Sequence, residues 1–275
     1  MKITDGRHAD VHIRDLATLT RLQFEAFLAG CDGDMAAHIV HDWKTCAHDY
    51  QLAPEGDWLI WLLMGGRGCG KTRAGAEWIR ARVSSGARRI AIVAPTYNDA
   101  REVMLEGESG VLNIGYPHDR PQYISSRRRL LWPCGAIGQV FTSEEPDGLR
   151  GPQFDCAWGD EFCAWKHSSS VLSNLRLALR LGTRPQLMMT TTPKPLESLR
   201  QLLQKSGLVL TRAATADNRS FLAPNFVEAM QDAYGGTRLG EQELGGNLLD
   251  NLTGALWTQE MIDAAYAPGV PALSK

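Results

Sequence analysis

An eight-residue segment, Gly65-Gly66-Arg67-Gly68-Cys69-Gly70-Lys71-Thr72, constrains the fold of this chain more than any other feature. It matches the pattern G-x-x-x-x-G-K-[ST]. The apolar run of residues 58–64 directly precedes it, and a helix-like stretch of residues 73–83 follows it. A strand before this pattern and a helix after it are the context in which it forms a phosphate-binding loop. The sequence therefore predicts a strand, loop and helix that together hold the phosphates of a nucleotide.

The glycines of this segment have a physical purpose. They let the backbone wrap closely around a phosphate, so that several backbone N–H groups and the positive end of the following helix point at one anion. Lys71 is then expected to reach the β- and γ-phosphates, and the Thr72 hydroxyl to bind Mg²⁺. The predicted nucleotide-binding residues are Gly65, Gly66, Arg67, Gly68, Cys69, Gly70, Lys71 and Thr72.

Composition narrows the class of protein. The chain has 275 residues, 44% of them hydrophobic, which is enough for one large core and a small appendage. Its formal net charge of −2 provides no global basic field, so any contact with DNA has to be local. The six cysteines form no C-x-x-C pair and no zinc-binding spacing, and we interpret them as reduced, cytosolic thiols. Without a long apolar span or a signal peptide, we expect a soluble, intracellular protein that contacts no membrane.

The pattern of apolar residues predicts the secondary structure. Residues 16–47 are expected to form two helices, the second behind the N-cap candidate Asp34 and with one buried face, which consists of Ala36, Ile39, Val40, Trp43 and Ala47. From residue 58 onward, short apolar runs predict strands covered on both faces of a parallel sheet. These strands are residues 58–64, 90–94, 154–158, 186–191 and 208–210. Residues 123–132 and 136–142, on either side of Pro133-Cys134-Gly135, are expected to add a hairpin to that sheet.

A second motif supports nucleotide hydrolysis rather than binding alone. The apolar strand of residues 154–158 leads to Asp160 and Glu161. At the end of a strand beside the loop, Asp160 would orient Mg²⁺ and Glu161 would polarise the attacking water. Small GTPases lack the second carboxylate, whereas P-loop ATPases of the additional-strand class carry a glutamate there. A third and weaker signal is the strand ending in Thr190, Thr191 and Thr192, whose hydroxyls would lie where a γ-phosphate sensor is needed.

Several segments, taken together, match the sequence pattern of a known protein family. They are residues 65–78, Asp160-Glu161, Thr190-Thr191-Thr192-Pro193, and the later runs 236–240, 242–246 and 254–257. The pattern, which extends over residues 43–257, resembles the ATPase domain of the large terminase subunit of tailed phages and of related prophage-like or gene-transfer-agent packaging systems. The resemblance implies an α/β fold of the additional-strand, RecA-like class of P-loop ATPases, with a mostly parallel central sheet flanked by helices, N-terminal helices and a small C-terminal lid.

The resemblance also implies roles for individual residues. Gln51 is the candidate for a glutamine that contacts the adenine, and Thr190 to Thr192 resemble the motif that couples hydrolysis to movement. Arg150 lies where the family tends to present a catalytic arginine to the nucleotide of a neighbouring subunit. Arg67 competes with Arg150 as an arginine that acts within its own subunit. The catalytic residues implied are Glu161, Arg150, Arg67 and Lys71, and the metal ligands are Thr72 and Asp160.

By the same resemblance, the chain is expected to use ATP and Mg²⁺ and to drive double-stranded DNA into a procapsid. The implied partners are double-stranded DNA, a portal ring, a small terminase subunit and further copies of the chain in a ring. The work would take place in the host cytoplasm, with the chain docked transiently on the procapsid. Expected divisions are an N-terminal helical segment packed on the core (1–50), the ATPase core (51–212), a lid (213–257) and a linker (258–275) toward a nuclease domain, and no nuclease activity is expected on this chain.

Two alternatives remain open from the sequence. One is another P-loop DNA translocase or a helicase-like ATPase, although the chain is too short for a second RecA-like domain. The other is an assembly module that uses nucleotide only to dock and has no motor activity. The intact set of Lys71, Thr72, Asp160 and Glu161 argues against that second alternative.

Overall fold

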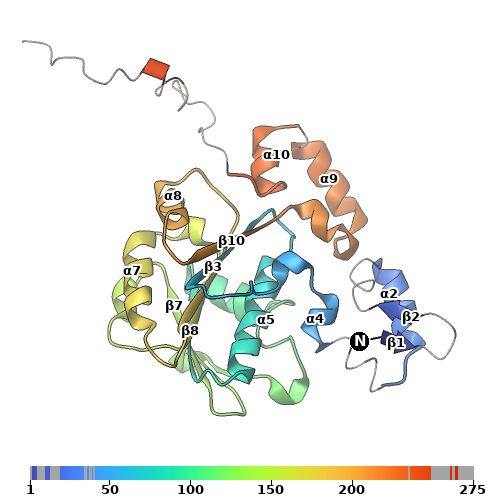
Figure 1. Ribbon diagram of the computed structural model, residues 1–275, viewed down its shortest axis with the longest axis horizontal. Helices are drawn as coiled ribbons and strands as arrows, with labels where there is room; N and C mark the ends of the chain where they lie inside the picture. Colours follow the sequence, from blue (N-terminus) through green and yellow to red (C-terminus); the bar gives the residue numbers. More distant parts are fainter. Residues whose placement is uncertain are drawn as a thin grey trace, which may run out of the picture.

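An eight-stranded sheet organises the chain (Figure 1). The structure is a computed structural model that describes residues 2–4, 10–12, 19–33, 36, 39, 41–234, 236–248, 261, 264 and 265. The strand order is β10-β3-β9-β8-β4-β7-β6-β5, and all neighbours from β10 to β7 are parallel. The strands are β3 (Ile60–Gly65), β4 (Arg89–Ala94), β5 (Gln122–Ile124), β6 (Arg129–Leu131), β7 (Ile137–Thr142), β8 (Cys156–Gly159), β9 (Gln186–Thr191) and β10 (Leu208–Ala213).

The order of the strands identifies the class of the fold. Strand β3 leads into the glycine-rich loop, and β8 leads to the acidic pair of residues 160 and 161. Strand β9 lies between them and pairs in parallel with both. An extra strand at this position is what the additional-strand class of P-loop proteins is named for. The predicted fold, a mostly parallel sheet with flanking helices, is therefore confirmed.

Two apolar layers cover the two faces of the sheet. Alternate residues of β3 enter different layers, since Trp61 and Leu63 belong to one cluster and Leu62 and Met64 to the other. The first cluster packs under helix α5 (Lys71–Ser84), and the second packs under α7 (Ser168–Ala178) and α8 (Glu197–Leu203). Because both faces are covered, the strands are apolar at consecutive positions, which is the pattern that indicated a parallel sheet.

The remaining helical elements are short. The α-helices are α2 (Arg21–Ala29), α4 (Trp43–Cys46), α6 (Tyr97–Asp99), α9 (Pro224–Tyr234) and α10 (Arg238–Glu243). Short 3₁₀ segments are η1 (Asp49–Gln51), η3 (Pro117–Asp119), η4 (Ser125–Arg127), η5 (Pro146–Leu149), η6 (Phe162–Ala164) and η7 (Thr215–Phe221), the last of which is kinked at Asn218. A π-helix lies at η2 (Ala100–Leu105). In the described part of the chain, every helix is too short or too polar to cross a lipid bilayer.

The first helix predicted within residues 16–47 is present as α2, whereas the second is only partly as predicted. Strands β1 (Lys2–Thr4) and β2 (Asp10–His12) precede both and form a small antiparallel sheet, so the segment 1–50 is not purely helical. The second predicted helix is interrupted at Asp42, which has an extended backbone (φ −83°, ψ 99°), and α4 begins after it. Aspartate favours helix starts over helix interiors, because its side chain competes for backbone hydrogen bonds. The N-cap candidate Asp34 and the face residue Val40 lie outside the described residues.

The predicted hairpin is also partly wrong. Its first arm, residues 123–132, is not one strand, since β5 and β6 are separated by the turn η4 and by Arg128 in the left-handed region (φ 52°). Strands β5 and β6 pair with each other, and β6 pairs with β7 around the turn that contains Gly135 (φ 83°). Strand β9 has the predicted bounds. Strand β8 starts later than predicted, because Phe154 makes only an isolated bridge to Leu179.

Candidate nucleotide-binding site

The glycine-rich loop connects the end of β3 to the start of α5, as the sequence predicted. Gly68 (φ 75°) and Gly70 (φ 82°) both have left-handed backbones, a conformation that glycine adopts without strain. A Cβ on Gly70 would lie 2.2 Å from the side-chain nitrogen of Gln51. A side chain at position 70 would therefore also displace the amide of Gln51.

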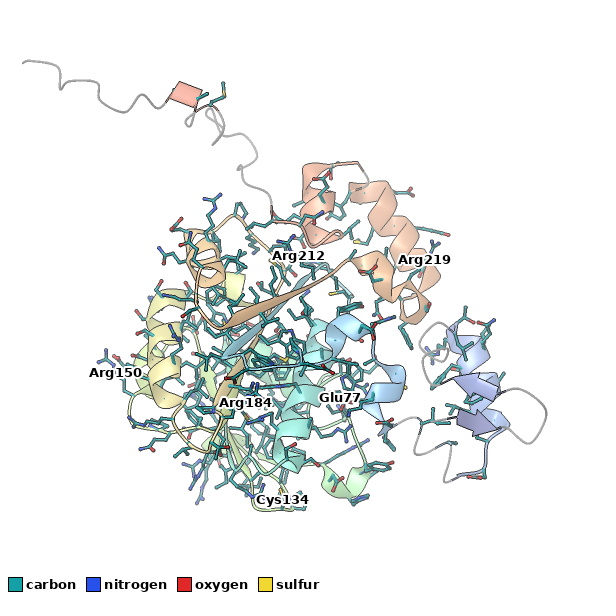
Figure 2. The ribbon with its side chains drawn as sticks, in the orientation of Figure 1. Glu77, Cys134, Arg150, Arg184, Arg212 and Arg219 are labelled. Atoms are coloured by element: carbon teal, nitrogen blue, oxygen red, sulfur yellow. The ribbon has the colours of Figure 1, made fainter. Side chains whose placement is uncertain are left out.

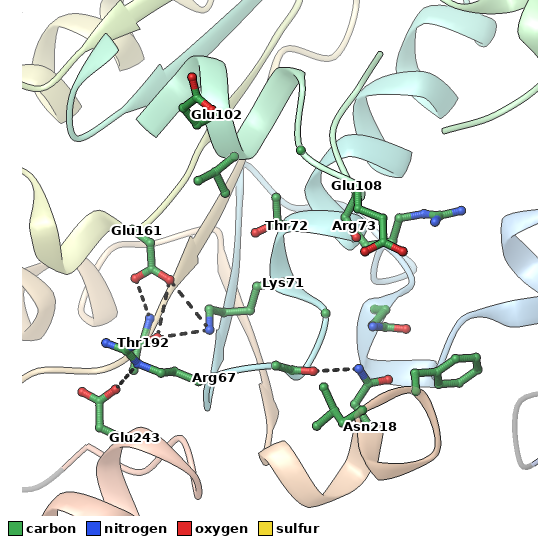
Figure 3. A pocket seen from close by; sticks show the side chains of 18 of the residues that line it. Arg67, Lys71, Thr72, Arg73, Glu102, Glu108, Glu161, Thr192, Asn218 and Glu243 are labelled. Carbon is green, nitrogen blue, oxygen red and sulfur yellow. Dashed lines mark hydrogen bonds and ion pairs between the residues drawn. The ribbon is translucent and has the colours of Figure 1, made fainter. Parts of the chain in front are cut away.

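Lys71 is the central cation of the site. Its side chain is only 7% exposed, and its ammonium donates to the carbonyl oxygens of Gly65 (3.0 Å) and Gly66 (2.9 Å) and to the hydroxyl of Thr192 (3.1 Å). The carboxylate of Glu161 lies 3.8 Å away. The residues that would surround a γ-phosphate thus converge on this ammonium (Figure 3).

The two carboxylates that follow β8 have different environments. Asp160 is almost fully buried and accepts a hydrogen bond from the hydroxyl of Thr190. Burial, and next the negative charge of Glu161, raise the pKa of Asp160 to about 7. Glu161 is 39% exposed and faces the cavity, together with Lys71. The first carboxylate is suited to a fixed structural or metal-binding role, and the second is open to water.

Glu161 has an unusual backbone conformation. Its φ of 48° and ψ of 54° place it in the left-handed region, which costs a residue other than glycine about 1 kcal/mol. Its carboxylate accepts two hydrogen bonds from Thr192, one from the backbone N–H at 3.2 Å and one from the hydroxyl at 3.5 Å. Such strain is typical of functional positions, and here it turns the side chain toward the end of β9.

The three threonines at the end of β9 are all buried. Thr190 contacts Asp160, and Thr192 contacts both Lys71 and Glu161. Thr191 instead accepts a hydrogen bond from the backbone of Cys163 at 3.0 Å. The strand between β3 and β8 therefore connects the loop to the acidic pair through side-chain contacts.

Residues of the N-terminal region contact the loop from one side. The buried side chain of Gln51 and the hydroxyl of Tyr50 both donate to the carbonyl oxygen of Cys69, at 3.2 and 3.1 Å. The ring of His48 stacks on Tyr50 and lies 3.2 Å from the amide oxygen of Asn218. Gln51, the predicted adenine contact, also lines the cavity. Its amide oxygen accepts a hydrogen bond from the backbone N–H of His48 at 3.0 Å, so both ends of the amide already have partners within the protein.

Residues 213–246, which we call the lid segment, contact the loop from the other side. The carboxylate of Glu243 pairs with Nε of Arg67 at 2.9 Å, and its backbone carbonyl accepts from the Arg67 N–H at 2.7 Å. Thr215 donates to the carbonyl oxygen of Arg67 at 2.6 Å. Asn218 donates to the carbonyl oxygen of Gly68 at 2.7 Å (Figure 3). Sequence reasoning assigned no role to Thr215, Asn218 or Glu243, although the run 242–246 was part of the family pattern.

A cavity of about 1000 Å³ opens above the loop. It is large enough for a nucleotide, since ligand pockets usually measure roughly 300–1,000 Å³. Of the predicted residues, its lining includes Gln51, Arg67, Gly68, Gly70, Lys71, Thr72, Glu161 and Thr192. Trp43, Asn218, Phe221 and Glu243 are lining residues that the sequence did not predict.

Arg150 is not part of this cavity. It follows η5, its side chain is 72% exposed, and Nε lies 3.2 Å from the carboxylate of Asp147. Figure 2 shows it at the margin of the molecule beside α7, on the side opposite α9. An arginine in this position does not reach the nucleotide of its own chain, and the structure leaves its predicted role between subunits untested.

The site has the donor set that a magnesium ion needs. Mg²⁺ prefers oxygen ligands and retains several waters, so that one or two protein oxygens suffice. Burial, and next the negative charge of Glu161, raise the pKa of Asp160, and a divalent cation beside the carboxylate would offset both effects. The hydroxyl of Thr72 provides a second oxygen at the cavity wall.

Comparisons with known proteins agree with this geometry. A family model described as "Terminase large subunit, T4likevirus-type, N-terminal" matches residues 62–264. The fold is similar to that of the large terminase ATPase domain of Thermus phage P74-26, at 19% identity and a TM-score of 0.56 over 74% of this chain and 94% of that one. It is also similar to the large terminase of another thermophilic bacteriophage in complex with ADP, at 17% identity and a TM-score of 0.57 over 78% of this chain and 52% of that one.

A further structural match is the large terminase of bacteriophage HK97, at 14% identity and a TM-score of 0.53 over 79% of this chain and 50% of that one. The chain thus spans about half the length of the ADP-bound terminase and of the HK97 protein. Comparison with curated protein sequences gave no match. At these identities the structural likeness shows the fold.

Proposed function

The chain belongs to the terminase large-subunit family, and we propose that it hydrolyses ATP to drive double-stranded DNA into a procapsid. One observation carries this proposal: Lys71, Glu161 and Thr192 converge at the phosphate end of a nucleotide-sized cavity. The similar large terminase that was solved with ADP was also solved with ATP-gamma-S, which supports an adenine nucleotide as the ligand of this related chain.

The roles of the residues follow from the geometry. The loop N–H groups and Lys71 would bind the β- and γ-phosphates and balance their charge. Glu161 would accept a proton from the attacking water, because its exposed carboxylate faces the cavity. Thr72 and Asp160 would hold Mg²⁺, which neutralises charge that develops on the phosphate oxygens. Gln51 would contact the adenine, and Thr190 to Thr192 would transmit the state of the phosphates to the sheet.

The contacts around the loop support the predicted lid. We propose that residues 213–257 form a lid that closes on ATP bound to the core of residues 51–212, since Thr215, Asn218 and Glu243 already hold the loop. The partners would be double-stranded DNA, a portal ring, a small terminase subunit and copies of this chain in a ring. The motor would work in the host cytoplasm, docked on the procapsid. The absence of nuclease activity stays a prediction, which a DNA nicking assay would test.

A steady-state ATPase assay with Mg²⁺ tests the proposal. Lys71→Ala should abolish hydrolysis, because the cation that balances the phosphate charge is lost while the loop backbone remains. Lys205→Ala, which removes an exposed lysine outside the cavity lining, is the matched control and should keep wild-type activity. Normal turnover by a folded Lys71→Ala protein would refute the assignment of the loop.

The same assay separates the proposal from its main alternative. An assembly module that uses nucleotide only to dock would bind ATP but show no turnover above that of Lys71→Ala. A motor should instead show turnover that DNA and the assembled ring increase. Wild-type protein without turnover, with or without DNA and partners, would favour the assembly module.

A further inference from the structure

The lid segment holds Arg67 in two ways, and only one of them depends on charge. The backbone N–H of Arg67 donates to the carbonyl oxygen of Glu243 at 2.7 Å, a neutral contact that survives any change of side chain. The guanidinium Nε of Arg67 also donates to the carboxylate of Glu243 at 2.9 Å. A substitution of the Glu243 side chain thus removes the ion pair and leaves the backbone contact in place.

Stability does not explain this ion pair. The side chain of Arg67 is 71% exposed, and ion pairs with such exposed partners contribute little to the free energy of unfolding. The side chain of Glu243 is only 17% exposed, so it is the fixed partner and the arginine is the one that is held. The ion pair therefore fixes the orientation of the Arg67 side chain, which would otherwise move freely in solvent.

In this orientation, the guanidinium of Arg67 lies at the end of the cavity that would hold the phosphates (Figure 3). Figure 3 shows Arg67 between Glu243 on one side and Thr192, Lys71 and Glu161 on the other. Both Arg67 and Glu243 line the cavity. Nε is occupied by Glu243, while the terminal nitrogens of Arg67 have no hydrogen-bond partner among the described residues. A guanidinium carries five N–H donors and binds phosphate oxygens in a bidentate manner, so these nitrogens remain available to a phosphate.

We propose that Glu243 is a positioning residue that holds Arg67 by Nε, so that its terminal nitrogens meet the γ-phosphate of ATP. The inference rests on the proposed ATPase function and deepens it, because it makes the lid segment a part of the catalytic site. Arg67 then stabilises charge in the transition state only while helix α10 is seated against the loop. Release of the lid segment withdraws the arginine and stops hydrolysis in that subunit.

A double-mutant cycle on the full chain tests this inference. Arg67→Ala should lower kcat by at least ~100-fold, the range for losing one donor to a transition-state oxyanion. Glu243→Gln keeps the size of the side chain but loses its charge, and should lower kcat by about 10- to 100-fold through misplacement of the arginine. The KM for ATP should change by less than about 3-fold, since the interaction is made mainly in the transition state. The double variant should have the kcat of Arg67→Ala alone, because Glu243 acts through Arg67.

Glu241→Gln is the matched control, since it lies on the same helix, is exposed and does not line the cavity. Thermal unfolding of each variant identifies any loss of folding. If the kcat effects of Arg67→Ala and Glu243→Gln multiply, Glu243 acts independently and the inference is wrong. A higher kcat for Glu243→Gln would also overturn it, because the ion pair would then keep the arginine away from ATP. A wild-type protein without ATPase activity would instead overturn the proposed function together with this inference.

Discussion

Thr192 connects the ammonium of Lys71 to the carboxylate of Glu161. Its hydroxyl accepts a hydrogen bond from Lys71 at 3.1 Å, and its backbone N–H donates to Glu161 at 3.2 Å. Thr192 follows β9, the strand that lies between the loop strand and the acidic strand. A displacement of β9 therefore changes the positions of both groups together, which is the connection that a coupling motif requires.

Removal of the Thr192 hydroxyl should slow hydrolysis. Thr192→Val keeps the shape of the side chain and the backbone N–H, but Lys71 loses an acceptor. A hydrogen bond to a charged group is worth about 1.5–3 kcal/mol, so we expect kcat to fall by roughly 10- to 100-fold, as measured by steady-state ATPase kinetics. Thr142→Val is the control, since the buried hydroxyl of Thr142 has no hydrogen-bond partner in the described structure and lies outside the cavity lining. Equal kcat values for the two variants would show that the Thr192 hydroxyl does not contribute to hydrolysis.

Glu161→Gln should separate nucleotide binding from hydrolysis. The amide keeps the shape of the side chain and still accepts a hydrogen bond from Thr192, but it does not take a proton from water. We expect nearly unchanged ATP affinity, measured with a fluorescent nucleotide, and a kcat at least ~100-fold lower. If affinity and kcat fall together, Glu161 is a structural or metal-binding residue and the base lies elsewhere.

Arg150 should act between subunits. Because it is exposed and lies outside the cavity of its own chain, it is available to a neighbour. Arg150→Ala should remove most activity without weakening ATP affinity much, and the wild-type activity should rise with protein concentration. Mixing Arg150→Ala with Glu161→Gln should restore part of the activity, since each supplies what the other lacks. No recovery in mixtures that co-assemble would shift the role to Arg67 or to another residue.

Gly75→Ala should destabilise the fold. A Cβ at Gly75 would lie 2.1 Å from the ring of Trp158, which is fully buried on β8. Overpacking of this kind costs about 1–3 kcal/mol, more than the helix propensity gained from alanine. The free energy of unfolding, measured in urea, should fall accordingly. Gly33→Ala, where a Cβ meets nothing within 4 Å, should leave it nearly unchanged; a similar value for both variants would mean that Trp158 moves aside at little cost.

Local patterns made much of the fold predictable. The loop, its flanking strand and its helix are adjacent in sequence, so their spacing alone indicated the unit of residues 58–83. Continuous apolar runs indicated strands covered on both faces, and β9 has the predicted bounds. The break at Asp42 and the left-handed Arg128 were not predictable in the same way, because single residues with unusual backbones do not disturb an apolar pattern.

The lid contacts were beyond prediction for a different reason. The hydrogen bond between Asn218 and Gly68 joins residues 150 positions apart, and the one between Arg67 and Glu243 joins residues 176 positions apart. No short sequence motif indicates such pairs, because they form only when the whole sheet brings distant segments together. The roles of Gln51 and Arg150 rest on the family resemblance alone, and they stay predictions.

The contacts of the loop carbonyl oxygens bear on the order in which the protein folds. The carbonyl oxygens of Arg67, Gly68 and Cys69 accept hydrogen bonds from Thr215, Asn218 and Gln51. The contacts of Thr215 and Asn218 span 148 and 150 positions. Contacts of such high sequence separation form slowly, since the entropy of closing a long loop is lost before they stabilise anything. A nascent chain that has emerged only as far as β8 already contains the whole glycine-rich motif and Gln51, yet it lacks Thr215 and Asn218. We therefore expect the loop to reach its final arrangement late in folding, after η7 has been synthesised.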